Sequence, residues 1–109
     1  MAASLEIQSD NTEEAKALMR EAVQNGLKAV GFQAEDYAKL LCPVDTGRLR
    51  DSITHTNDED SAYIGTNVEY AAYVEYGTSK TVAQPFLEPA ATQHSEEYKA
   101  IFEYYCRNA

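Results

Sequence analysis

The sequence of 109 residues is short of basic side chains. Nine Lys and Arg stand against eighteen Asp and Glu, which gives a formal net charge of −9. Because proteins hold nucleic-acid phosphates mainly with Lys and Arg, this balance argues against specific nucleic-acid binding. It is the charge of a soluble protein, and it also suits a surface along which DNA slides without sticking.

Long apolar runs are absent and cysteines are scarce. No stretch is long enough to span a bilayer, and Glu6 stands where a secretory signal would carry basic residues. We therefore expect a protein that is made and used in the cytoplasm, or in a particle assembled there. In a reducing compartment Cys42 and Cys106 are more often small buried residues than a disulfide, which is kept as the alternative.

The remaining composition is that of an ordinary folded protein. Hydrophobic residues make up 44% and charged residues 25% of the chain, which indicates neither disorder nor a fibrous repeat. A chain of this length can bury one modest core. We predict a single domain over residues 1–109.

Residues 10–41 have the spacing of one long amphipathic helix. Its apolar face consists of Ala15, Leu18, Met19, Ala22, Val23, Leu27, Val30, Ala34, Tyr37, Ala38 and Leu41. The candidates for its N-terminal cap are Asp10, Asn11 and Thr12. Gly26 and Gly31 favour a bend or break, and Pro43 ends the helix.

A turn and a β-hairpin are predicted next. Val44-Asp45-Thr46-Gly47 favours a chain reversal, because Asp or Thr can bond a nearby amide and Gly tolerates positive φ. The spacing of Leu49 and Ile53 fits one helical turn. Residues 52–56 and 61–66 are rich in Thr, Ile, Tyr and Ser, and a polar segment separates them. This pattern indicates two strands of a hairpin.

Two further helices are expected. Thr66-Asn67-Val68-Glu69 is a capping box that opens a short helix over residues 68–76, and Gly77 can end it in a left-handed cap. Tyr70, Tyr73 and Tyr76 form a stripe on this helix that exceeds what a small core needs. The last helix is predicted over residues 89–106, beginning at Pro89. Phe86 and Leu87, framed by Pro85 and Pro89, are predicted to plug the core.

The candidates for chemistry are weak, and we predict no catalytic, cofactor-binding or metal-binding residue. His55 and His94 have no partner at a metal-ligand spacing. Cys42 lies at a helix end, where the dipole disfavours a thiolate. Asp45-Thr46-Gly47 matches the aspartic-protease tripeptide, but that chemistry needs two carboxylates. Asp58-Glu59-Asp60 lacks the glycine of a calcium loop and fits a solvated hairpin tip.

Four blocks in order resemble a known phage family. They are Pro43-Val44-Asp45-Thr46-Gly47-Arg48-Leu49-Arg50-Asp51-Ser52-Ile53, Ile64-Gly65-Thr66-Asn67-Val68-Glu69-Tyr70-Ala71, Val74-Glu75-Tyr76-Gly77-Thr78 and Gln84-Pro85-Phe86-Leu87-Glu88-Pro89-Ala90. The chain is similar to the siphophage head–tail joining family, also described as neck, tail-completion or minor tail-component proteins. The resemblance implies an α+β domain in which a long N-terminal helix packs on a small antiparallel sheet, with a short middle helix and a C-terminal helix.

The resemblance also implies a structural role without catalysis. Such a subunit forms a ring between the portal-side connector and the tail tube or tail terminator of a phage or prophage virion, assembled in the bacterial cytoplasm. The motif positions with structural roles are Asp45, Thr46, Gly47, Leu49, Gly65, Thr66, Gly77, Pro85, Phe86 and Pro89. The candidate subunit-interface residues are Tyr70, Tyr73, Glu75, Tyr76 and Thr78. A ring on the particle is compatible with a monomer in solution.

One departure and two alternatives accompany this prediction. Only residues 78–83 connect Gly77 to Gln84, where members of the family can carry a longer projecting arm. One alternative is an acidic inhibitor that mimics DNA and binds a host nucleic-acid enzyme, suggested by size and charge alone. The other is a small hydrolase using Asp45, for which Asp45→Asn would fold normally and lose turnover.

Overall fold

The computed structural model describes the backbone of residues 2–44 and 47–108 and the side chains of those ranges from Thr12 onward. Its elements are α1 (Ala2–Leu41), α2 (Arg48–Ser52), β1 (Thr54–Asn57), β2 (Ala62–Gly65), α3 (Ala71–Tyr76), α4 (Leu87–Thr92) and α5 (Ser95–Arg107). The predicted α+β class is confirmed. The predicted turn at Asp45 and Thr46 lies outside the described residues.

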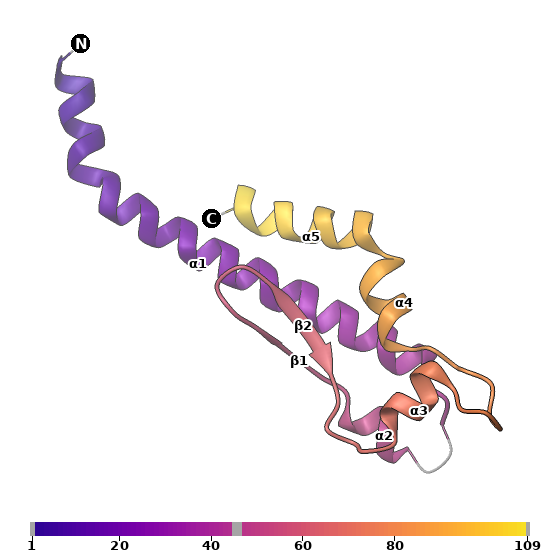
Figure 1. The fold of residues 1–109 in the computed structure, drawn as a ribbon. Helices are drawn as coiled ribbons and strands as arrows, with labels where there is room; N and C mark the ends of the chain where they lie inside the picture. Colours follow the sequence, from indigo (N-terminus) through magenta and orange to yellow (C-terminus); the bar gives the residue numbers. More distant parts are fainter. Residues whose placement is uncertain (1, 45–46, 109) are drawn as a thin grey trace.

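Helix α1 forms the long axis of the molecule (Figure 1). It begins at Ala2, so the predicted start at Asp10 was wrong and the proposed cap residues lie inside the helix. The break expected at Gly26 or Gly31 is also absent from this continuous helix. Both glycines instead allow close packing, since a Cβ would lie 2.9 Å from Cδ1 of Phe102 at Gly26 and 2.8 Å from Cδ2 of His55 at Gly31.

The hairpin is confirmed, with shorter strands than the sequence suggested. β1 and β2 pair antiparallel, from Thr54 opposite Gly65 to Asn57 opposite Ala62. Ser52 belongs to α2 rather than to a strand. At the tip, Oδ1 of Asp58 accepts hydrogen bonds from backbone N–H groups at 2.8 Å, which makes this carboxylate part of the turn.

The short middle helix begins at Ala71, so the predicted capping box was wrong. The Thr66 hydroxyl accepts a hydrogen bond from the N–H of Val68 at 3.1 Å, which is a turn before the helix. Glu69 does not reach back to Thr66, because its carboxylate pairs with Arg48 at 3.2 Å. Gly77 has the expected positive φ of 78°, but its ψ of 177° is extended rather than a left-handed helical cap.

The predicted last helix is divided into α4 and α5, with the break at Gln93 and His94. One straight helix would carry residues 95–107 away from α1. The break instead lets α5 run back along α1 (Figure 1). There the ring of His94 stacks on Tyr37 with centroids 3.6 Å apart. The hydroxyl of Tyr98 donates a hydrogen bond to the carbonyl of Ala90, which links α5 to α4 across the break. Burial of the Tyr98 side chain raises the pKa of Tyr98 to about 12.

The core lies around the C-terminal half of α1, which the hairpin covers on one side and α4 and α5 on the other (Figure 1). Its buried members are Ala38, Cys42, Leu49, Ile53, Val68, Ala71, Phe86 and Ala90. By contrast, every residue from Thr12 to Glu21 is exposed. The molecule is therefore elongated, with extents of 72 × 23 × 21 Å.

Candidate functional site

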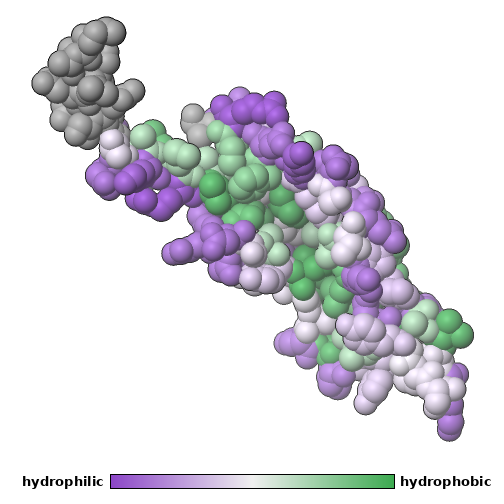
Figure 2. Space-filling view, turned by 45° about the horizontal axis from the view of Figure 1, so that its top comes forward, coloured by the Kyte–Doolittle hydropathy of each residue, from purple (hydrophilic) through white to green (hydrophobic). Residues whose placement is uncertain are grey.

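Helix α3 and the loop after it form one end of the molecule, opposite the N-terminus of α1 (Figure 1), and hydrophobic as well as hydrophilic residues reach the surface at this end (Figure 2). Tyr73 is 63% exposed, Tyr76 76% and Val82 83%. Tyr70 is half-buried, and the guanidinium of Arg48 lies 5.5 Å from its ring centroid. We call Tyr70, Tyr73, Tyr76 and Val82 the aromatic end. Large apolar groups gathered in this way make the aromatic end a candidate interaction surface.

The loop at this end is shaped by its own hydrogen bonds. The hydroxyl of Thr78 accepts the N–H groups of Lys80 and Thr81, and the N–H of Thr78 donates to the carbonyl of Thr81. The N–H of Gln84 then returns to the carbonyl of Val74 at 2.8 Å. A Cβ at Gly77 would lie 2.7 Å from the backbone nitrogen of Ala83, so only glycine fits this closure.

Glu75 has a different place from the other interface candidates. It is only 5% exposed, and its carboxylate accepts hydrogen bonds from the N–H groups of Phe86, Leu87 and Glu88 at 2.9 to 3.1 Å. A helix start leaves four N–H groups without an internal acceptor. Here Glu75 satisfies three, and the fourth position is Pro89, which has none. Glu75 therefore joins α3 to α4 rather than facing a neighbour.

The remaining motif positions are dispersed. Leu49 and Phe86 are in the core, Gly47 precedes α2 with a φ of 85°, and Pro89 lies in the first turn of α4. Pro85 and Thr78 are exposed, while Gly65 ends β2. Of the predicted interface set, the aromatic end thus contains Tyr70, Tyr73 and Tyr76, and Thr78 shapes the loop beside them.

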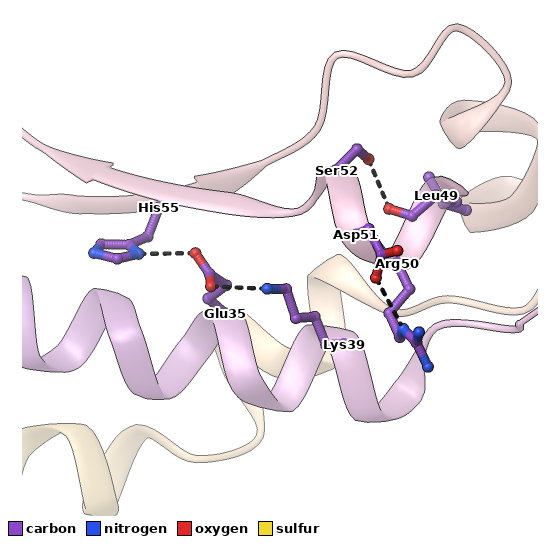
Figure 3. Close-up of polar contacts among 7 residues, drawn as sticks. All are labelled: Glu35, Lys39, Leu49, Arg50, Asp51, Ser52 and His55. Atoms are coloured by element: carbon purple, nitrogen blue, oxygen red, sulfur yellow. Dashed lines mark hydrogen bonds and ion pairs between the residues drawn. The ribbon is translucent and has the colours of Figure 1, made fainter. Parts of the chain in front are cut away.

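A polar cluster fixes the hairpin to α1 beside the core (Figure 3). Nδ1 of His55 lies 2.9 Å from one carboxylate oxygen of Glu35, and Nζ of Lys39 lies 3.1 Å from the other. Burial of Glu35 raises its pKa, but the hydrogen bonds from His55 and Lys39 and the charge of Lys39 outweigh it. The pKa of Glu35 is therefore held below its usual value of 4.5.

Glu35 should make the fold sensitive to acid. A carboxyl with a lowered pKa stabilises the folded chain above its unfolded pKa, and this contribution is lost as the pH falls through the folded pKa. Glu35→Gln should therefore lower the unfolding free energy by roughly 1 kcal/mol near pH ~6 and change little near pH ~3, measured by urea denaturation. In the matched control, Glu96→Gln removes an exposed carboxylate of α5 and should leave the pH profile unchanged. Equal profiles for Glu35→Gln and the wild type would contradict this role.

The described residues supply little for catalysis. Nowhere in residues 12–44 and 47–108 do three His, Cys, Asp or Glu side chains gather as a metal site. Cys42 is buried, which raises the pKa of its thiol, while Cys106 is exposed, and both are free. Both histidines have packing partners, Phe32 for His55 and Tyr37 for His94. No helix of the described chain is both long and apolar enough to cross a bilayer.

Comparison with known proteins decides the family. The family model described as "Bacteriophage HK97-gp10, putative tail-component" matches residues 9–77, more than half of the chain. The chain belongs to the HK97-gp10-like family. The family is one of structural phage tail components, so the protein is a structural component of a phage particle and contacts other virion proteins. No curated protein and no solved structure matches the chain.

The match to the HK97-gp10-like family covers most of α1, the hairpin and α3. It therefore includes Tyr70, Tyr73, Tyr76 and Glu75. The loop that carries Val82, and helices α4 and α5, lie beyond the matched residues. The aromatic end thus combines a helix within the matched residues with a loop that lies beyond them.

Proposed function

We propose that this protein is a ring-forming subunit at the head–tail junction of a tailed phage or prophage particle, between the portal-side connector and the tail tube. The observation that supports this is the aromatic end. Tyr73, Tyr76 and Val82 are not among the buried core residues, and most of their surface stays exposed after the chain has folded. In a particle subunit they are available for contacts with other virion proteins.

The shape of the molecule allows head-to-tail contacts between identical subunits. The aromatic end and the exposed stretch from Thr12 to Glu21 lie at opposite ends of an elongated body. Contacts between two different surfaces of identical subunits close into a ring when the rotation between neighbours is right. With a net charge of −9, a ring lined by carboxylates would let DNA pass without holding it.

The aromatic end is tested by single substitutions. Tyr73→Ala and Tyr76→Ala should each leave the fold within about 0.5 kcal/mol of wild type, because both rings are exposed. Each should weaken ring formation, or capture by the connector and tail-tube proteins, by at least about tenfold, because buried tyrosines carry much of an interface's energy. Light scattering on the purified protein measures ring formation, and light scattering on its mixtures with the connector and tail-tube proteins measures capture.

The matched control is Tyr104→Ala, which removes an exposed tyrosine from α5 far along the molecule. It should assemble as the wild type does. If all three variants assemble equally well, the aromatic end is not the interface. If the wild-type protein stays a monomer and binds none of the particle proteins, the junction role is contradicted. That result would favour the alternative of a DNA-mimicking inhibitor.

A further inference from the structure

A groove with a volume of about 680 Å³ runs between the hairpin and the C-terminal helices. Its floor is α1, at Val30 and Ala34, and its walls are β2, α3 and α4, represented by Ile64, Ala71 and Leu87. β2 pairs only with β1 within the described chain, so its outer backbone edge lies toward this groove. The groove offers apolar contact together with unpaired backbone groups.

The charges around this groove are of one sign. Glu69 and Glu88 are exposed at its rim, and Glu75 lies deeper with its oxygens occupied by backbone N–H groups. Among the described residues that line the groove there is no Lys, Arg or His. Arg48 partly neutralises Glu69, but Glu88 makes no ion pair within the described chain. An occupant should therefore combine an apolar side chain with a cation.

The loop after α3 has these two properties. Among the described large apolar side chains Val82 is the most exposed, and Lys80, two residues earlier, is exposed without an ion pair in the described chain. Hydrogen bonds to Thr78 already hold the loop in shape. Little conformational freedom would then be lost when the loop docks.

The loop and the groove lie on different sides of α3. Ala72 and Tyr76 face the groove, whereas Tyr73 and Val74 line a second hollow together with Val82 of the loop. α3 therefore separates each loop from its own groove. The loop of one copy can instead approach the groove of the next, which is a contact between different surfaces and suits a ring.

We propose that residues 78–83 of one subunit dock into the groove of a second copy, with Val82 against the apolar floor and Lys80 beside Glu88. This inference rests on the proposed ring and names the contact that closes it. The loop side of the aromatic end then contacts one neighbour and the groove contacts the other, with Tyr76 at the boundary between the two surfaces.

Charge reversal tests the contact in the full chain, under whichever condition gives wild-type rings. Lys80→Glu and Glu88→Lys should each raise the concentration needed for half assembly by about tenfold, measured by light scattering. The double variant restores an opposite-charge pair and should recover most of the loss. Lys99→Glu and Glu96→Lys, exposed changes on α5, are the matched controls, and thermal melting confirms that each variant is folded.

The outcomes separate this inference from the proposed function. If Tyr73→Ala weakens the rings while neither charge reversal does, the loop–groove contact is wrong and the junction role stands. If Glu88→Lys weakens capture of a partner protein but not ring formation, and Lys80→Glu changes neither, the groove binds that partner rather than a second copy. If the wild type forms no ring alone or in any mixture, the proposed function fails and this contact fails with it.

Discussion

Replacing Glu75 with Ala is expected to lower the free energy of unfolding by about 3–5 kcal/mol. The change leaves three N–H groups at the start of α4 without an acceptor, in a place from which water is largely excluded. Hydrogen bonds to a charged group contribute more than neutral ones, and an orphaned buried donor costs its full desolvation. The carboxylate also lies at the positive end of a helix. Urea denaturation followed by circular dichroism measures the loss.

Two comparisons isolate this effect. Glu75→Gln keeps one acceptor oxygen and should lose about half as much stability as Glu75→Ala. Glu88→Gln removes a neighbouring carboxylate that is exposed and accepts none of these bonds, so it should melt close to the wild type. If Glu75→Ala melts as the wild type does but fails to assemble, Glu75 would be the interface residue that the sequence suggested.

The sequence was a good guide wherever a local pattern determined the structure. The 3.6-residue period of residues 10–41 identified α1, and Thr- and Tyr-rich segments around an acidic turn identified the hairpin. Phe86 between two prolines was correctly placed in the core. These features depend on side chains close together in the chain, so their signals can be read without knowing the rest of the fold.

The misplaced features depend on contacts between distant segments. Thr66 and Glu69 have the residue types of a capping box. The Glu69 carboxylate instead pairs with Arg48, which lies 21 residues earlier in the chain. The break between α4 and α5 at His94 is stabilised by stacking of the His94 ring on the ring of Tyr37 in α1. The role of Glu75 depends on α4, which starts twelve residues later at Leu87 and directs its first N–H groups toward the Glu75 carboxylate. The one sequence signal for this role was Pro89, which has no N–H group. Its presence in the first turn of α4 leaves three rather than four N–H groups that need an acceptor.

Phe86→Ala is expected to destabilise the chain by about 3–5 kcal/mol, because Phe86 is 0% exposed and the substitution leaves a cavity among Leu49, Ile53 and Ala90. With typical total stabilities of about 5–15 kcal/mol, the variant should approach unfolding at 37 °C. Urea denaturation at low temperature measures the difference. Phe86→Leu should lose less, roughly 1–2 kcal/mol, since most of the volume is kept.

Val82→Ala is the control for this substitution, since Val82 is exposed on the nearby loop and should leave stability almost unchanged. Equal losses at both positions would contradict the placement of Phe86. The two positions also separate folding from assembly. Phe86 holds the start of α4 where Glu75 caps it, so Phe86→Leu subunits that remain folded should still assemble, whereas Val82→Ala subunits should fold normally and assemble poorly.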